Sequence, residues 1–327
     1  MPNKVCKMIK MKIAIVGSNS PFTTEYFYAR AFESLGHKVA IVDQYSGLFV
    51  GRKRFLYRLI LTRASGIRDI FESEFVNEIV VKQIRNEHPD IVIIFKGEAL
   101  SKQSISQISS EFSTFLFYPD AYRYQSLLKG RINSFECVFT HSINHSLYYK
   151  LGARRVITIP WACDPGFHRK IKTRKLYDVV FMGSPYLNRY VYLRKLDSVH
   201  IFGSYWIIVP GIKHETVLGD NFIRIINQSK INLNIQHPTD SNADAPTWRI
   251  FEVAGCGGFI LSSHIPSLNA YFPDIVTFKN PDDMVSKALW YIDNESERDE
   301  ISQSLMERCR KYHTFVKRAE EMLSVFH

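Results

Sequence analysis

The sequence has few of the features that mark membrane-spanning, secreted or zinc-binding proteins. Its five cysteines, at positions 6, 137, 163, 256 and 309, form no C-x-x-C pair and no histidine-rich spacing, so we expect no structural zinc. The longest apolar runs, such as 91–95, fall far below the roughly 20 residues that a membrane-spanning helix needs. Residues 1–10 are polar and basic and show no secretory signal. These absences indicate a reduced, cytoplasmic protein.

A dinucleotide-binding motif is also missing. The first predicted strand, 12–16, is followed by a turn that holds only Gly17 where a dinucleotide site needs G-x-G-x-x-G. Asp43, at the end of the second predicted strand, is therefore not a credible ribose ligand for a nicotinamide cofactor. The β-turn-α-β pattern of this region is an indication of architecture alone.

The net charge of +10 indicates an anionic partner, which could be nucleic acid, an anionic lipid surface or a phosphorylated small molecule. Segment 52–68 has no acidic residue, and its basic residues alternate with apolar ones. They are Arg52, Lys53, Arg54, Arg58, Arg63 and Arg68. This pattern is typical of a helix lying on an anionic membrane, or equally of a domain-face helix whose apolar stripe packs in the core. No recognisable nucleic-acid-binding motif accompanies the charge, so nucleic acid is not expected.

The length of 327 residues and the hydrophobic content of 46% predict a globular protein of two domains. Strand-like and helix-like patterns alternate, which predicts an α/β fold. Strands are predicted at 12–16, 39–42, 91–95, 114–118, 137–140, 178–182, 199–203, 231–235 and 259–261, and helices at 23–35, 72–87, 284–294 and 297–327. Polar residues follow several of the first-half strands, where open parallel sheets bind ligands. They are Lys96, Glu98, Asp120 and His141.

The most informative segment is 243–262, A-D-A-P-T-W-R-I-F-E-V-A-G-C-G-G-F-I-L-S. A helix is predicted to begin at Pro246 with Asp244 as a candidate cap, and to end at the glycines before a short buried strand. Arg249 and Glu252 are three residues apart and share one helix face. A guanidinium for phosphate beside a carboxylate for ribose hydroxyls suggests a nucleotide site at this helix N-terminus. The alternative is an ordinary solvated ion pair.

The run W-R-I-F-E-V-A-G-C-G-G-F-I-L resembles the signature of the CgeB-like (spore-maturation type) glycosyltransferases, which have the GT-B fold. A second match runs from 135 to 168, where a P-x-x-x-D-P turn is formed by Pro160, Asp164 and Pro165. Arg298 and the H-T-x-x-x-R run of His313 and Arg318 also resemble the end of these sequences. The resemblance covers about 115–327, and the first hundred residues resemble the family in architecture only.

The resemblance implies two Rossmann-like domains that face a central cleft, with the last helix crossing back to the first domain. The polar, basic stretch 165–175 suits a linker, so we predict an acceptor-side domain at 1–170 and a nucleotide-sugar domain at 171–327. Donor-binding roles are implied for Gly183, Ser184, Arg189, Arg249, Glu252 and Gly257, catalytic roles for Asp120, His141 and Asp244, and an acceptor-side loop at Gly17, Ser18 and Asn19. In relatives the loop matching 202–206 lies over the nucleotide base, although Trp206 is as compatible with the core.

The predicted reaction is transfer of a sugar from a nucleoside-diphosphate sugar, most simply a UDP-sugar, to an acceptor hydroxyl of a glycan or lipid-linked saccharide in surface or envelope glycan synthesis. No D-x-D motif follows a predicted strand, so we expect protein cations in place of a metal, and no other cofactor. The wider clan is mostly retaining. Two alternatives stay open: a nucleotide-sugar epimerase, and a non-catalytic nucleotide-sugar-binding or coat-assembly protein, suggested by Asp244 where relatives have Glu. The predicted location is the cytoplasm, with possible attachment to the inner face of the plasma membrane through 52–68.

Overall fold

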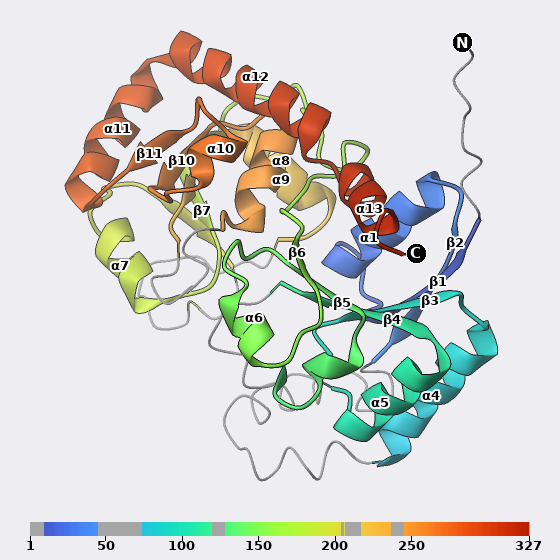
Figure 1. Cartoon of the computed structure of the whole chain (residues 1–327). Helices are drawn as coiled ribbons and strands as arrows, with labels where there is room; N and C mark the ends of the chain where they lie inside the picture. Colours follow the sequence, from blue (N-terminus) through green and yellow to red (C-terminus); the bar gives the residue numbers. More distant parts are fainter. Residues whose placement is uncertain are drawn as a thin grey trace, which may run out of the picture.

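A computed structural model describes residues 10–44, 74–97, 99–119, 128–203, 206, 217–236 and 245–326. Two parallel β-sheets, one in each half of the chain, form its framework (Figure 1). The predicted α/β class is confirmed. The basic segment 52–68 and the residues Glu98, Asp120 and Asp244 lie outside the described residues.

The first sheet has the strand order β2-β1-β3-β4-β5-β6, and every neighbouring pair is parallel. Its strands are β1 (Lys12–Gly17), β2 (Lys38–Asp43), β3 (Ile91–Phe95), β4 (Ser113–Tyr118), β5 (Cys137–Thr140) and β6 (Val156–Thr158). Successive side chains of β1 enter different cores, because Ile13 and Ile15 pack with α1 (Thr24–Ser34) whereas Ala14 and Val16 pack with α4 (Glu74–Glu87). Burial on both faces explains why these strands are continuous apolar runs.

The second sheet has the order β11-β10-β9-β7-β8 and is also parallel. Its strands are β7 (Tyr177–Met182), β8 (His200–Phe202), β9 (Ser229–Asn234), β10 (Ile260–Ser263) and β11 (Val276–Phe278). The remaining helices are α5 (Lys102–Glu111), α6 (Ser146–Lys150), α7 (Leu187–Leu193), α8 (Asp220–Gln228), α9 (Trp248–Gly255), α10 (Leu268–Tyr271), α11 (Pro281–Asp293), α12 (Glu295–Tyr312) and α13 (Phe315–Leu323), with a 3-10 turn, η2 (Ile132–Ser134).

The last helix, α13, lies beside α1 at the first sheet, as Figure 1 shows at the blue and red ends of the chain. Phe315, Ala319 and Met322 recur on one face of α13 and are buried in the core that contains Ile13 and Phe27. The predicted return of the last helix to the first half is therefore confirmed. The predicted continuous helix at 297–327 is wrong, because the chain leaves the helical path between Tyr312 and Phe315 to cross between the two halves.

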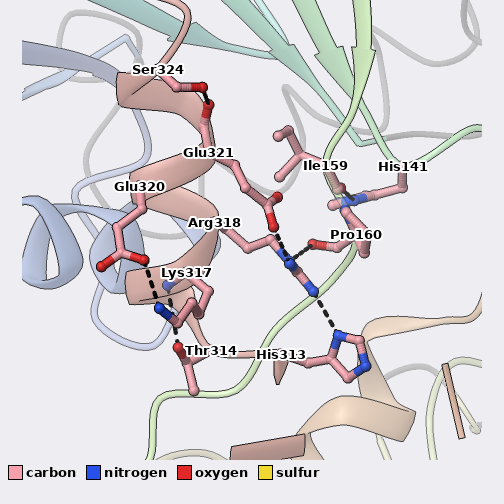
Figure 2. A network of polar contacts seen from close by, with 10 residues as sticks. All are labelled: His141, Ile159, Pro160, His313, Thr314, Lys317, Arg318, Glu320, Glu321 and Ser324. Atoms are coloured by element: carbon pink, nitrogen blue, oxygen red, sulfur yellow. Dashed lines mark hydrogen bonds and ion pairs between the residues drawn. The ribbon is translucent and has the colours of Figure 1, made fainter. Parts of the chain in front are cut away.

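The two segments that cross between the sheets are bonded to each other. The Cys163 N–H donates to the His313 carbonyl at 2.9 Å, and the Phe315 N–H donates to the Cys163 carbonyl at 3.0 Å. Arg318 of α13 donates through Nε to the Pro160 carbonyl and through Nη2 to His313 Nδ1 at 2.7 Å (Figure 2). The junction is thus a short two-stranded element tied by one buried arginine. The boundary near residue 170 stays a prediction, and it falls between β6 and β7.

One boundary at the most informative segment needs correction. Helix α9 begins at Trp248, not at Pro246, and its N-cap is Thr247 in extended conformation, not Asp244. The Thr247 hydroxyl caps no N–H of the helix, and it donates to Asn234 Oδ1 at 3.0 Å. This bond ties the start of α9 to the end of β9.

Candidate functional site

Helix α9 is terminated by the glycines that follow it. The Gly258 N–H donates to the Val253 carbonyl at 3.0 Å and the Gly257 N–H to the Ala254 carbonyl at 2.9 Å, a Schellman motif. Gly257 has φ of +68°, a conformation that favours glycine. The glycine at 257 is therefore explained by its role in ending α9, at the C-terminal end of the helix. Its predicted donor-binding role has no support from this position.

Arg249 and Glu252 form the ion pair that their spacing predicts. Arg249 Nη1 lies 2.9 Å from Glu252 Oε2, with 29% of the Arg249 side chain and 12% of the Glu252 side chain exposed. The guanidinium also lies over the Phe222 ring of α8, 4.5 Å from its centroid. This pair is far more buried than the surface ion pairs that contribute little to stability. The alternative of an ordinary solvated ion pair therefore does not describe it.

The Glu252 carboxylate has a second partner that sequence reasoning missed. His168 Nε2, fully buried, lies 3.8 Å from Glu252 Oε1. Burial acts to raise the pKa of Glu252, but Arg249 and His168 together outweigh it and hold the pKa below its ordinary value. The carboxylate is thus kept ionised and acceptor-only, as binding to sugar hydroxyls requires. In the sequence His168 ends the run D-P-G-F-H, which is part of the second match to the family. Only the fold shows that this histidine lies beside α9.

Arg189 lies at the same strand end as the start of α9. Its Nε donates to the Ile235 carbonyl at 3.1 Å, one residue beyond β9, and its Nη1 donates to the Ser184 carbonyl at 2.8 Å. The guanidinium stacks over Tyr186 at 4.8 Å. Since Asn234 of β9 bonds the α9 N-cap, the structure brings Arg189, Ser184 and the α9 N-terminus around the end of one strand.

The loops after β7 and β8 pack directly on each other. A Cβ on Gly203 would lie 2.2 Å from the Gly183 carbonyl oxygen, so only glycine fits there. Trp206 is fully buried, and its indole Nε1 donates to the same Gly183 oxygen at 2.7 Å. The placement of Trp206 in the core is therefore confirmed, and a role of the 202–206 loop at a nucleotide base stays a prediction. Gly183 serves as the contact between the two loops.

The predicted acceptor-side loop follows β1. The Ser18 N–H donates to Glu25 Oε1 at 3.0 Å, and a Cβ on Gly17 would lie 2.6 Å from Glu25 Cγ. Glu25 of α1 is itself buried, while Asn19 is exposed. The loop is thus held by a carboxylate of the following helix, with glycine at its closest approach.

His141, the residue after β5, is connected to α9 by a row of ring contacts through Trp161 and Trp248. Its ring lies 3.6 Å from the Trp161 ring, which stacks at 5.4 Å and 8° on Trp248, the first residue of α9. His141 Nδ1 bonds the Ile159 carbonyl at 2.5 Å (Figure 2). Burial lowers the pKa of His141 to about 3. The ring is therefore neutral near pH 7, with Nδ1 protonated and with Nε2 buried and without a hydrogen-bond partner among the described residues.

The structure brings together Arg249, Glu252, Arg189, Ser184 and His141 around the start of α9. Asp120 and Asp244 lie outside the described residues, so their predicted catalytic roles stay predictions. Within the described ranges, no group of three or more His, Cys, Asp or Glu side chains could hold a metal ion. Nor do those ranges contain a helix long and apolar enough to span a membrane.

Two parallel sheets joined by a short crossing, with the last helix returned to the first, define the GT-B class of fold. Solved structures share it over nearly the whole chain. One is an alpha-glucosyltransferase in complex with UDP-glucose and abasic DNA, with a TM-score of 0.69, 12% identity, and coverage of 97% of this chain and 100% of that chain. Another is sucrose-phosphate synthase from Thermosynechococcus elongatus, with a TM-score of 0.64, 10% identity, and coverage of 97% of this chain and 98% of that chain. A third is HepE from Anabaena in complex with UDP-glucose, with a TM-score of 0.64, 12% identity, and coverage of 96% of this chain and 99% of that chain.

The second half of the sequence is similar to a known family. Residues 182–324 match the family described as "Glycosyl transferase-like". The match includes Ser184, Arg189, Arg249 and Glu252, whereas His141 and His168 precede it. No curated protein matches the sequence significantly. The predicted CgeB-like subtype is finer than these matches and stays a prediction.

Proposed function

We propose that this protein transfers a sugar from a nucleoside-diphosphate sugar to an acceptor hydroxyl. The observation that carries the proposal is the ionised, largely buried Glu252 paired with Arg249 on α9, within the segment that matches the family described as "Glycosyl transferase-like". A buried carboxylate must be matched by partners, and Arg249 and His168 occupy only part of its accepting capacity. Two ribose hydroxyls suit the remainder.

The diphosphate is assigned to the cationic end of this site. An α-helix leaves its first N–H groups without intrahelical partners, and the side chain of the α9 N-cap, Thr247, bonds none of them. Arg249 lies in the first turn of α9 and Arg189 lies across the end of β9. Together they supply the positive charge that stabilises a leaving nucleoside diphosphate. Asp244 and its loop are assigned to the donor sugar, and the loop at Gly17, Ser18 and Asn19 to the acceptor.

The reaction breaks the bond between the sugar's anomeric carbon and the diphosphate oxygen and forms a new bond to the acceptor oxygen. The acceptor proton must leave, and the leaving diphosphate or Asp120 is proposed to take it. A pKa of about 3 makes His141 a weak proton acceptor. Retention of configuration and independence from metal remain part of the proposal.

The donor is proposed to be a UDP-sugar, because several structures of this fold contain UDP-glucose or its fluoro analogue. Incubation with radiolabelled UDP-, GDP- and dTDP-sugars, with and without EDTA, tests the proposal. Transfer or slow hydrolysis of one donor, unchanged by EDTA, is the expected result. Isomerisation of the donor, or binding without turnover, would replace the proposal by one of its two alternatives, and reversible loss of activity in EDTA would reject the metal-free reaction.

Membrane attachment through segment 52–68 is a separate proposal based on charge alone, because each basic residue near an anionic bilayer contributes about 1 kcal/mol. Such attachment would serve a lipid-linked acceptor in envelope glycan synthesis. Co-sedimentation with phosphatidylglycerol vesicles across a salt series tests it. We expect salt-sensitive binding that is lost when Arg52, Lys53, Arg54 and Arg58 become Ser. Equal partitioning of both proteins would favour a soluble acceptor.

A further inference from the structure

His168 is a fully buried histidine in the segment that joins the two sheets. The Asp164 N–H donates to its Nδ1 at 2.9 Å. A nitrogen that accepts a hydrogen bond carries no proton, so in the neutral ring the proton is on Nε2. Among the described residues this buried Nε2 has no hydrogen-bond partner. An unpaired buried donor is unfavourable, which makes the direction of this N–H informative.

This Nε2 lies close to the Glu252 carboxylate, which is at the centre of the candidate site. Glu252 Oε1 lies 3.8 Å from it, while Arg249 holds Oε2 at 2.9 Å. The longer distance exceeds a hydrogen bond by under about 1 Å, so a small shift of either side chain completes the bond. The two oxygens would then have one fixed protein donor each, and the carboxylate could not rotate.

Both halves of the molecule hold the His168 ring in this position. Phe27 of α1 packs on the ring at 5.2 Å between centroids. Asp164, which orients the ring through its N–H, is bound by Arg30 of α1 at 2.9 Å from Nε to Oδ2. The other side is set by α9, three residues beyond Glu252, where a Cβ on Gly255 would lie 3.1 Å from His168 Cβ. Only a residue without a side chain at 255 lets the joining segment approach this closely.

We propose that His168 is a positioning residue for Glu252. Its Nε2–H fixes Glu252 Oε1 so that the remaining lone pairs of the carboxylate face the two ribose hydroxyls of a nucleoside diphosphate. This inference rests on the proposed function. His168 itself contacts no substrate, and acts from the junction between the halves through the carboxylate alone.

The test compares UDP with 2′,3′-dideoxy-UDP, which lacks both hydroxyls, by calorimetric titration of the full chain. Wild type is expected to prefer UDP by about tenfold or more. His168→Phe should reduce this preference to about twofold by weakening UDP alone, and His168→Gln, which keeps an N–H donor, should restore most of it. His37→Phe is the matched control. His37 is also buried, its Nδ1 accepts the Met11 N–H at 3.2 Å, and its Nε2 has no hydrogen-bond partner in the described part of the chain. It lies directly before β2 in the first half, far from α9 in the sequence.

Retention of the UDP preference in His168→Phe would overturn the proposal, and so would an equal loss of affinity for both nucleotides, which indicates a merely structural role. A second measurement needs no nucleotide. Nitrogen-15 spectra should show His168 protonated at Nε2, with that signal shifted in Glu252→Gln. Protonation at Nδ1, or no shift, would overturn the contact. Failure of wild type to bind UDP or GDP rejects the proposed function instead, and the spectra then decide the His168–Glu252 contact alone.

Discussion

Arg318 donates to the carbonyl of Pro160, 158 residues away in the sequence, at 3.0 Å. This bond joins the helix that returns to the first sheet with the segment that leaves it. The same guanidinium contacts His313 and Glu321, and only 4% of its side chain is exposed (Figure 2). One residue thus holds both crossings between the halves in a fixed relation.

Removal of this arginine should therefore be costly. Arg318→Met leaves the Pro160 oxygen and His313 Nδ1 without their donor, and we expect a loss of about 2 to 4 kcal/mol in the free energy of unfolding. The control is Lys317→Met, since Lys317 pairs with Glu320 on the same helix with 53% of its side chain exposed. That variant should lose under about 0.5 kcal/mol. Urea titration measures both, and equal losses would contradict a special role for Arg318.

The stability of the protein should also fall in acid through His313. Burial, with a contribution from the Arg318 charge, lowers the pKa of His313 from 6.5 to about 4. Because the folded pKa is depressed, the unfolded state binds the proton first, and stability present above pH 6.5 is lost as the pH falls toward 4. Through this group the free energy of unfolding should be about 2 kcal/mol lower at pH 5 than at pH 7.5.

Urea unfolding at those two pH values tests the contribution of His313. His313→Asn, which keeps an acceptor for Arg318, should remove about 2 kcal/mol of the pH dependence. The exposed His264 provides the control, and His264→Asn should leave the dependence as it is in wild type. An unchanged slope in His313→Asn would show that other groups cause the loss in acid. His141, with a pKa of about 3, is expected to account for much of the remaining dependence.

The contact between the β7 and β8 loops gives a steric prediction. Gly203→Ala places a Cβ 2.2 Å from the Gly183 oxygen, so the loops must separate and the Trp206 bond to that oxygen weakens. Gly36→Ala is the control, because Gly36 also has a positive φ, +91° against +150° at Gly203, and nothing lies within 4 Å of its added Cβ. Each variant should lose about 1 kcal/mol of folding stability through backbone strain. Gly203→Ala should lose about 1 to 3 kcal/mol more because of the clash. Thermal unfolding compares them, and equal shifts would exclude the clash.

Strands and helix ends were predictable from the sequence where local chemistry decides them. The runs at 91–95 and 137–140 are the strands β3 and β5 residue for residue, because parallel strands buried on both faces are continuous apolar runs. The end of α9 followed from its glycines, and the Arg249–Glu252 pair from helical spacing.

What the sequence could not show depends on contacts between distant segments. Thr247 starts α9 because Asn234 takes its hydroxyl, which local capping preferences do not reveal. Trp206 is buried because the β7 loop supplies an oxygen for its indole. His168 reaches Glu252 only because Gly255 lets the joining segment lie against α9. The fold class could be predicted from patterns alone, whereas the contact of His168 with Glu252 and the burial of Trp206 needed the tertiary structure.

The ribose assignment depends on Glu252, so Glu252→Ala is the most direct test of the site. A hydrogen bond to a charged group contributes about 1.5 to 3 kcal/mol, and loss of the carboxylate should raise the dissociation constant for UDP about 30-fold or more. Arg249, whose side chain is 29% exposed, can turn to solvent in the variant, so the fold should persist. The control is Glu111→Ala, which removes another Arg–Glu pair, that between α5 and Arg85 of α4. It should leave UDP affinity unchanged. An unaltered dissociation constant in folded Glu252→Ala would remove Glu252 from the donor site.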